Sequence, residues 1–336
     1  IQGRLTVSAR ATSADVARRA GVSRATVSYV LNDRPGHSIS AATREKVRAA
    51  ADELGYIPNH SARALRGKLP PVILVVTREV PFGRNVGDMM DTFAELAAQH
   101  GFSLVSLRSG NPLSLETTVV HLRPRLVITT LPVGEEDLQL LSRLHAPVVD
   151  GWGAHLRTIG GGQAARMQVE RLLAAGRRRL AHLGATEENL QVFQQERRAG
   201  MEAACAEAGL PAPLQAAMPM MTRPEELAPL REVLRRWRGL PEPVDAVACY
   251  NDFWAAALLQ AARAEGVAVP GELSVIGLDD EPMAAFLEPP LTTIDYDASG
   301  LARALFAQGL ELIGEEAVGF DEAPSAPFHV IERGSV

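Results

Sequence analysis

The feature that most constrains the fold is a short helical stretch near the start of the chain that is interrupted once, at Gly21. Before the interruption, apolar residues including Ala17 recur at helical spacing. After it, Ser23 can cap a second helix over residues 24–31. Glycine suits the turn because it adopts positive φ without steric cost. The spacing from Ala17 through Gly21 to Val27 is typical of a helix-turn-helix. An ordinary helical hairpin of an all-α domain is the alternative.

The neighbouring residues extend this pattern in both directions. Thr12 can cap the first helix, and Asp15 then lies near its positive end. Ser40 can cap a third helix, which we expect to end at Gly55. A basic segment over residues 59–66 follows, and it is too short to be stable alone, since isolated helices below about 12 residues are marginal.

Charge is distributed unevenly along the 336 residues. Residues 1–70 hold 12 Lys and Arg against 5 Asp and Glu, whereas the rest of the chain holds 22 against 35, and the net charge is −6. A basic head on an acidic body is typical of a nucleic-acid-binding domain joined to another domain.

The two cysteines, Cys205 and Cys249, lie far apart and show neither a disulfide framework nor metal-ligand spacing. A reducing cytosol is the expected compartment for such a chain. The sequence shows no signal peptide and no run of about 18 apolar residues, which a membrane span needs. We therefore expect a cytoplasmic protein with no membrane partner, no metal and no cofactor.

Beyond residue 70, short apolar runs alternate with helical stretches. This alternation predicts parallel sheets with helices on both faces. The expected strands are Val72–Thr77, Ser103–Leu107, Leu126–Thr130, Pro147–Asp150, Arg179–Gly184, Ala246–Tyr250 and Leu273–Leu278.

Residues 12–68 closely resemble the DNA-binding head and hinge of the LacI/GalR family of bacterial repressors. The matching pieces are Asp15-Val16-Ala17, Ala20-Gly21-Val22-Ser23, Thr26-Val27-Ser28, Val30-Leu31-Asn32, Thr43-Arg44-Glu45-Lys46-Val47 and Leu54-Gly55-Tyr56-Ile57-Pro58-Asn59. The resemblance implies a small all-α helix-turn-helix domain followed by an α/β, two-lobed, periplasmic-binding-protein-like domain with parallel sheets. The expected divisions are a disordered leader over 1–11, the helix-turn-helix domain over 12–57, a hinge and linker over 58–70, and an effector-binding and dimerisation domain over 71–336.

By this resemblance, the helix that begins at Arg24 lies in the major groove of double-stranded DNA. An arginine can pair with a guanine edge and an alanine can touch a thymine methyl group. The expected base-facing residues are Arg24, Ala25 and Tyr29. The expected phosphate contacts are Ser23, Thr26, Ser28, Asn32, Tyr56 and Asn59, although each serine or threonine could equally be a helix cap.

In the hinge, the resemblance places Leu65 as a wedge between base pairs of the minor groove, flanked by Arg63 and other basic residues. A linker leucine that is covered by the next domain is the alternative for Leu65.

Three residues of the body match effector contacts in the family: Arg197, Asn251 and Asp279. An arginine, an amide and a carboxylate together suit a hydroxyl-rich ligand. Arg197 is expected where a helix opens at Glu196. Asn251 and Asp279 follow predicted strands, where open α/β sheets place ligands and where such residues also cap helices.

The resemblance therefore implies a dimeric, sequence-specific repressor that binds a near-palindromic operator and is gated by a small polar effector such as a sugar. A constitutive DNA-binding regulator with a degenerate cleft is the alternative, because Gly160–Gly162 stands where many members carry an aspartate-containing turn. An enzyme that uses this glycine run as a nucleotide loop is disfavoured. The sequence shows no strand–GxGxxG–helix unit and no P-loop, and we expect no catalytic residues.

Overall fold

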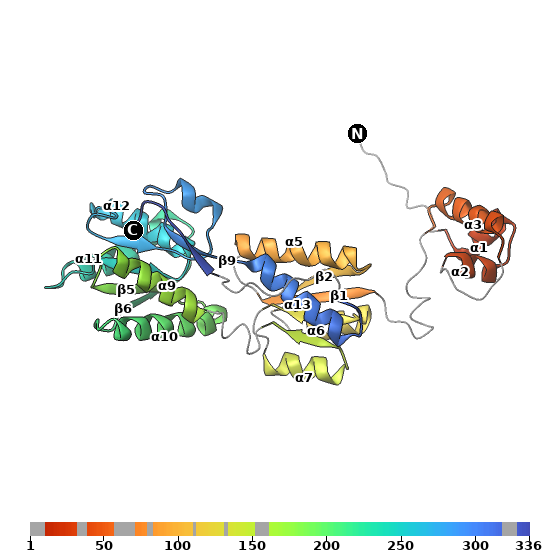
Figure 1. Ribbon diagram of the computed structural model, residues 1–336, viewed down its shortest axis with the longest axis horizontal. Helices are drawn as coiled ribbons and strands as arrows, with labels where there is room; N and C mark the ends of the chain where they lie inside the picture. The colour runs from red at the N-terminus through yellow and green to blue at the C-terminus, as the bar shows by residue number, and fades with distance from the viewer. Residues whose placement is uncertain are drawn as a thin grey trace. The chain divides into compact units, whose positions relative to one another are not determined.

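The computed structural model describes residues 11–31, 39–56, 71–78, 83–109, 112–130, 134–151, 161–317 and 328–336. Its contacts divide the chain into two compact units, residues 1–70 and 71–336, which are described separately (Figure 1). We call the first unit the head and the second unit the body.

The described part of the head contains three helices: α1 (Ser13–Ala20), α2 (Arg24–Leu31) and α3 (Ala41–Glu53). Thr12 and Asp15 form a capping box at the start of α1, and Gly21 ends that helix with φ of 68°. Ser40 caps α3 by accepting a hydrogen bond from the main-chain N–H of Thr43. The expected caps and the glycine turn are therefore confirmed.

Apolar side chains from all three helices form the core of the head. Val16 and Ala17 of α1 pack with Val27 of α2 and Val47 of α3, and all four are buried. Arg19 on α1 also pairs with Glu53 at the end of α3, at 2.7 Å. These contacts hold the three helices together, and α1 and α2, with 8 residues each, are too short to be stable in isolation.

The body consists of two lobes with the same architecture. Lobe 1 comprises residues 71–151 and 298–317, and its parallel sheet has the strand order β2-β1-β3-β4. Its elements are β1 (Val72–Arg78), α5 (Arg84–Gln99), β2 (Ser103–Ser109), α6 (Pro112–Leu122), β3 (Leu126–Thr129), α7 (Glu135–Arg143), β4 (Val148–Asp150) and α13 (Ala298–Leu312).

Lobe 2 comprises residues 161–296 and 328–336, and its parallel sheet has the order β6-β5-β7-β8. Its elements are α9 (Gly161–Ala174), β5 (Leu180–Ala185), η1 (Glu188–Leu190), α10 (Gln191–Glu207), β6 (Leu214–Met218), η2 (Pro224–Leu227), α11 (Ala228–Arg238), β7 (Ala246–Cys249), α12 (Asp252–Glu265), β8 (Ser274–Ile276), η3 (Pro282–Phe286), β9 (Thr293–Tyr296) and β10 (Phe328–Ile331). Strands β9 and β10 form a separate antiparallel pair.

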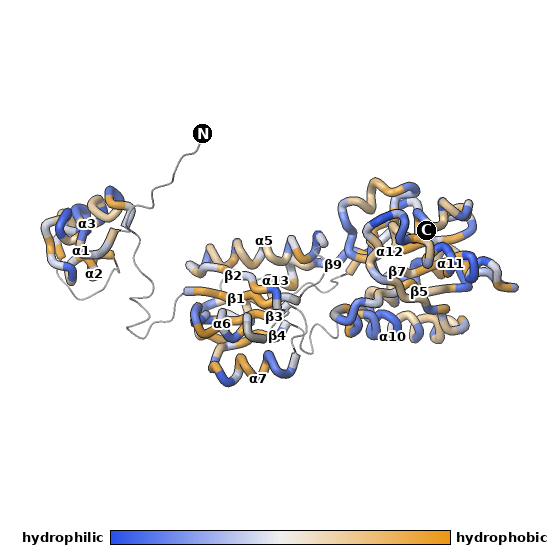
Figure 2. The backbone as a smooth tube through the Cα atoms, turned by 180° about the vertical axis from the view of Figure 1, so that it is seen from behind, coloured by the Kyte–Doolittle hydropathy of each residue, from blue (hydrophilic) through white to orange (hydrophobic). Residues whose placement is uncertain are grey.

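Each sheet is covered by helices on both faces, and each face has its own core. In lobe 1, α5 and α13 pack Phe93 and Phe306 on one face, whereas α6 and α7 pack Leu115 and Leu141 on the other. Hydrophobic residues are concentrated along the central strands (Figure 2). Because both faces of the strands are buried, their sequences read as continuous apolar runs rather than as an alternating pattern.

All seven expected strands are present, with ends that differ from the expectation by one or two residues. The described residues contain three strands outside these seven: β6, β9 and β10. Strand β6 lies at an edge and is mostly exposed, and its sequence Leu214–Met218 contains two alanines and a glutamine. It therefore lacks the β-branched run that marks a buried strand.

Cys205 and Cys249 are both buried and free. Within the described residues, no cluster of three or more His, Cys, Asp or Glu could hold a metal ion. None of the helices in the same part of the chain is long and apolar enough to cross a membrane.

Candidate functional site

Helix α2 of the head presents two of the three predicted base-reading residues to solvent. Arg24 and Ala25 are exposed in its first turn. Ser23 caps the helix, because its Oγ accepts a hydrogen bond from the main-chain N–H of Thr26 at 3.0 Å. The hydroxyls of Ser23 and Thr26 are also hydrogen-bonded to each other, at 2.9 Å. Ser23 is therefore a helix cap and Thr26 is its hydrogen-bond partner, and these roles leave a phosphate contact open to both residues.

The remaining predicted DNA contacts within the described head are less exposed. Ser28 and Tyr29 are half-buried on α2. Tyr56 packs against the head core, and its main-chain N–H donates to the carbonyl of Ala51 at 2.8 Å. Four predicted contacts lie outside the described residues: Asn32, Asn59, Arg63 and Leu65.

Arg24 differs from two other arginines of the head. Arg18 pairs with Asp15 at 3.2 Å and Arg19 pairs with Glu53 at 2.7 Å. Within the described part of the chain, Arg24 has no ion-pair partner. Its guanidinium is therefore available to a nucleic acid without breaking a salt bridge.

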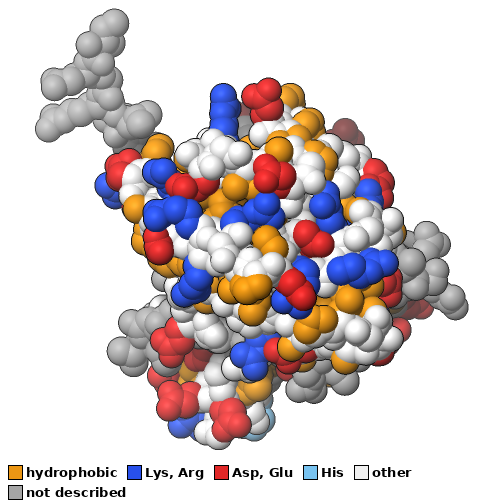
Figure 3. All heavy atoms as spheres, turned by 90° about the vertical axis from the view of Figure 1, so that its left-hand side faces the viewer, with side chains coloured by type: hydrophobic (Ala, Val, Ile, Leu, Met, Phe, Trp, Pro, Cys, Tyr) orange, Lys and Arg blue, Asp and Glu red, His pale blue; other side chains and the backbone are white. Residues whose placement is uncertain are grey.

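The surface of the body offers a contrast. The face drawn in Figure 3 intersperses acidic and basic side chains. Many arginines of lobe 2 are already paired with carboxylates, as in Arg171–Glu332, Arg231–Glu265 and Arg238–Glu272. Paired charges of this kind do not form the unneutralised basic surface that attracts DNA phosphates.

The three predicted effector residues come together at the carboxyl ends of the lobe 2 strands, in what we call the strand-end cluster (Arg197, Tyr250, Asn251 and Asp279). Arg197 is only 9% exposed. Its Nη1 donates to the carbonyl of Tyr250, and its guanidinium lies 4.0 Å from the centre of the Tyr250 ring. The Nε of Arg197 is buried and has no hydrogen-bond partner. Buried donors usually have a partner, so this atom is a natural contact for a ligand.

Arg197 lies near the middle of α10, and the helix begins at Gln191. The expectation that the helix opens at Glu196 was wrong. The five residues before Glu196 contain no cap signal that separates them from the helix, and η1 leads directly into α10.

Asn251 has two roles in the cluster. It caps α12, because the main-chain N–H of Phe253 donates to its Oδ1 at 3.0 Å, and its Nδ2 donates to Asp279 Oδ2 at 3.3 Å. Asp279 has φ of 99° and precedes η3, whose N-cap is Glu281, so the helix-cap alternative is wrong for Asp279. Burial raises the pKa of Asp279, whereas the charge of Arg197 and the hydrogen bond from Asn251 oppose that rise.

Residues outside the sequence prediction complete this region. Asn85, in the first turn of α5 in lobe 1, donates from Nδ2 to the carbonyl and to Oδ1 of Asp279, at 3.3 and 3.4 Å. The Oδ1 of Asn85 is buried and has no partner. Asp252 is fully buried beneath the cluster and accepts hydrogen bonds from Thr293 Oγ1 and from the main-chain N–H of Glu281. In the sequence, Asp252 could have been predicted only from its position, because it follows Asn251 directly after a strand.

The glycine run at 160–162 has a packing role in its described part. A Cβ at Gly200 on α10 would lie 2.4 Å from the carbonyl oxygen and 2.6 Å from the Cα of Gly162 on α9. The two glycines therefore let α9 and α10 approach closely.

Comparisons with known proteins agree with this geometry. The model of the family described as "Bacterial regulatory proteins, lacI family" matches residues 12–59, and that of the "Periplasmic binding protein-like domain" matches residues 169–336. The HTH-type transcriptional regulator GalR of Salmonella typhimurium (strain SL1344) is 30% identical over 327 residues, covering 91% of this chain and 90% of the relative. The chain belongs to the LacI family.

Solved structures of family members share the fold. The lac repressor dimer bound to operator and the anti-inducer ONPF has a TM-score of 0.78 and 25% identity, and the match covers 97% of this chain and 99% of that one. The complex of the transcriptional regulator CelR with cellobiose has a TM-score of 0.63 and 26% identity, and the match covers 97% and 100%. The predicted fold class is confirmed. The chain is a LacI-family DNA-binding transcriptional regulator, and its relatives are regulators rather than enzymes.

Proposed function

We propose that this LacI-family protein is a repressor that binds a near-palindromic operator as a homodimer and is gated by a small polar effector. The observation that carries the gating is the strand-end cluster, in which the buried Nε of Arg197 lacks a hydrogen-bond partner and the half-buried carboxylate of Asp279 lies nearby. The CelR relative was solved with cellobiose, and the lac repressor with ONPF. A sugar is therefore the ligand class that we propose.

In this proposal, Arg197, Asn251 and Asp279 hydrogen-bond the effector. Arginine only donates, a carboxylate accepts, and an amide does both, so the three together match the mixed donors and acceptors of sugar hydroxyls. The Tyr250 ring beneath Arg197 restricts the orientation of the guanidinium.

In the head, Arg24, Ala25 and Tyr29 read bases in the proposal, and Ser23, Thr26, Ser28 and Tyr56 contact phosphates. The same proposal assigns phosphate contacts to Asn32 and Asn59, which lie outside the described residues. It assigns a hinge contact to Arg63 and the minor-groove wedge to Leu65, and both of these also lie outside that part of the chain.

An exposed apolar patch on lobe 2 supports dimerisation. Phe286 of η3 is 87% exposed, and Met283 in the same short helix is also exposed. Aromatic and methionine side chains are enriched at protein interfaces. We propose that a second copy of the chain covers this patch, as the dimeric state of the lac repressor relative suggests. Sedimentation of Phe286→Asp should show weakened association, and an unchanged dimer would remove the patch from the interface.

A footprint on the DNA upstream of the chain's own gene tests operator binding. Arg24→Ala should weaken binding to the protected site by about 5- to 150-fold, since a good arginine–guanine contact is worth about 1–3 kcal/mol. Arg18→Ala is the matched control, because Arg18 is exposed but paired with Asp15. An equal loss on random DNA for Arg24→Ala would make Arg24 a phosphate contact.

A panel of mono- and disaccharides that includes cellobiose tests the gating. A sugar that binds should raise the unfolding temperature and change the affinity for the footprinted site, and Asp279→Asn should remove both effects. Binding of effector and operator must be reciprocally coupled. If no sugar, nucleoside or other small polar metabolite changes operator affinity, the constitutive alternative holds.

A further inference from the structure

The N-terminus of α5, a helix of lobe 1, is capped by a side chain of lobe 2. Its own N-cap residue is Gly83, which has no capping side chain. The main-chain N–H of Arg84 instead donates to Glu281 Oε1 at 3.0 Å. A Cβ at position 83 would lie 2.0 Å from that carboxylate oxygen. Glycine at position 83 therefore leaves room for the carboxylate to reach the helix terminus, where a negative charge is stabilised.

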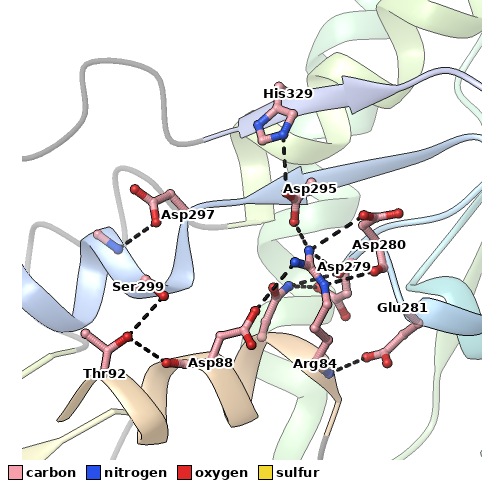
Figure 4. Close-up of polar contacts among 12 residues, drawn as sticks. Arg84, Asp88, Thr92, Asp279, Asp280, Glu281, Asp295, Asp297, Ser299 and His329 are labelled. Atoms are coloured by element: carbon pink, nitrogen blue, oxygen red, sulfur yellow. Dashed lines mark hydrogen bonds and ion pairs between the residues drawn. The ribbon is translucent and has the colours of Figure 1, made fainter. Parts of the chain in front are cut away.

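The side chain of Arg84 reaches into the loop of lobe 2 that carries Glu281 (Figure 4). Its Nε donates to the carbonyl of Asp280 at 3.0 Å, and its Nη2 donates to the carbonyl of Asp279 at 3.3 Å. The Nη2 also forms an ion pair with Asp295 Oδ1, where β9 crosses between the lobes. One guanidinium thus binds two main-chain carbonyls and a carboxylate, a use of its planar fork that lysine cannot reproduce.

The carboxylates of Asp280 and Asp295, which both lie next to Arg84, also have partners within lobe 2. Asp280 accepts from Arg333 Nη2 at 2.6 Å, and Asp295 lies 3.2 Å from His329 Nε2. Asp280 and Asp295 are only about a fifth exposed. Arg84, whose Nη1 also lies 3.5 Å from Asp88 Oδ2 on its own helix, therefore joins lobe 1 to this polar network of lobe 2.

The position of this network ties it to the strand-end cluster. Arg84 donates a hydrogen bond to the carbonyl of Asp279, and its neighbour Asn85 donates to both the carbonyl and the carboxylate of that residue. Burial raises the pKa of Glu281, and the hydrogen bond from Arg84 opposes that rise. Removal of Arg84 would leave Asp279, Asp280 and Glu281 crowded without their lobe 1 cation, which disfavours this setting of the lobes.

We propose that Arg84 is a positioning residue that latches lobe 1 to the 279–281 loop of lobe 2. The relative orientation of the two lobes is then coupled to the contacts that Asp279 makes. The coupling rests on the proposed function, because it matters only if Asp279 contacts an effector. The latch itself depends on neither effector nor operator. Loss of the latch shifts the population away from the lobe setting seen here, and DNA affinity follows that shift.

Amide hydrogen exchange of the full-length protein tests the latch without any ligand. Arg84→Met should speed exchange at least tenfold both in the first turns of α5 and in residues 278–283, because each segment caps or anchors the other. Arg125→Met is the matched control, since Arg125 pairs with Glu315 inside lobe 1. It should leave both segments unchanged. Faster exchange in α5 alone would overturn the latch and reduce Arg84 to a local contact.

A charge swap separates the latch from simple misfolding. Arg84→Asp alone should lose protection in both segments, and the double variant Arg84→Asp/Asp295→Arg should recover a substantial part of it in both. If the double variant is no better protected than the single one, the ion pair does not hold the lobes.

Affinity for the footprinted operator then tests the coupling. Arg84→Met should change it by at least fivefold, the lower end of typical allosteric couplings, whereas Arg125→Met should not. Faster exchange with unchanged operator affinity would overturn the coupling and leave a purely structural latch. Failure of every sugar to bind would instead contradict the proposed function and leave the exchange result standing.

Discussion

The two lobes of the body have the same strand order and the same two layers of helices, yet they differ at the carboxyl ends of their strands. In lobe 1, buried threonines lie at the end of β3 and next to the end of β1, at Thr129 and Thr77. In lobe 2, the corresponding edge holds buried ionisable side chains, including Arg197 and Asp252. The shared topology places a possible site at this edge in both lobes. The side chains that follow the strands decide which lobe supplies most of the ionisable groups at such a site.

The largest expected effect concerns Asp252, a buried carboxyl of lobe 2. Burial raises its pKa to about 8, and the nearby charges of Asp279 and Asp280 act in the same direction. Between about pH 4 and pH 8, the folded protein keeps the proton of Asp252 whereas the unfolded chain releases it. The contribution of this group to the free energy of unfolding is therefore lost as the pH rises towards 8.

Asp252→Asn should mimic the protonated carboxyl. Its unfolding free energy in urea should therefore decline less than that of the wild type between pH 5 and pH 8.5, by on the order of a few kcal/mol. Trp237 and Trp254, both buried in lobe 2, report the transition by fluorescence. Parallel pH profiles for the two proteins would show that Asp252 is ionised in the folded state.

A smaller effect is expected from buried hydrogen bonds at the strand ends. Gln168 of α9 is buried, and its Nε2 donates to the carbonyls of Cys249 and Gly277 at 3.1 and 2.8 Å. Gln168→Leu should cost about 1–3 kcal/mol, because it leaves buried carbonyls without this donor.

Thr129→Val is the lobe 1 counterpart. Thr129 Oγ1 donates to Asp150 Oδ1, which is at the exposed end of β4, at 3.1 Å. Its loss should cost only about 0.5–1.5 kcal/mol, since water can solvate the carboxylate. Urea unfolding followed by circular dichroism checks both variants, and equal losses would argue against the contrast between the lobes.

Substitution of one helical glycine in each lobe should have effects of opposite sign. Gly200→Ala should destabilise lobe 2 by about 1–3 kcal/mol, because its Cβ would collide with the backbone of Gly162. Gly87→Ala on α5 should instead stabilise lobe 1 by about 0.4–1 kcal/mol, since nothing lies within 4 Å of its Cβ. Thermal unfolding of the two variants should shift in opposite directions. A higher unfolding temperature for Gly200→Ala would mean that α9 and α10 are not in close contact.

The site was predictable where its parts are local in sequence. The capping box of Thr12 and Asp15 and the turn at Gly21 depend on residues within four positions of each other. Asn251 and Asp279 could be expected together because strand ends of a parallel sheet meet at one edge. Arg84 and Asn85 could not be expected there, because their partners lie almost 200 residues further along the chain.

The sequence by itself therefore determined the head, the order of the strands along the chain, and the residue types at the lobe 2 strand ends. Capping, turn geometry and hydrophobic runs are short-range, and each acts on the backbone that carries it. Only the tertiary structure decided that Glu281 caps a helix of the other lobe, that Asn251 binds both Phe253 and Asp279, and that Gly162 faces Gly200. These contacts depend on how whole elements pack, and a lone arginine or glycine in a sequence does not reveal what it packs against.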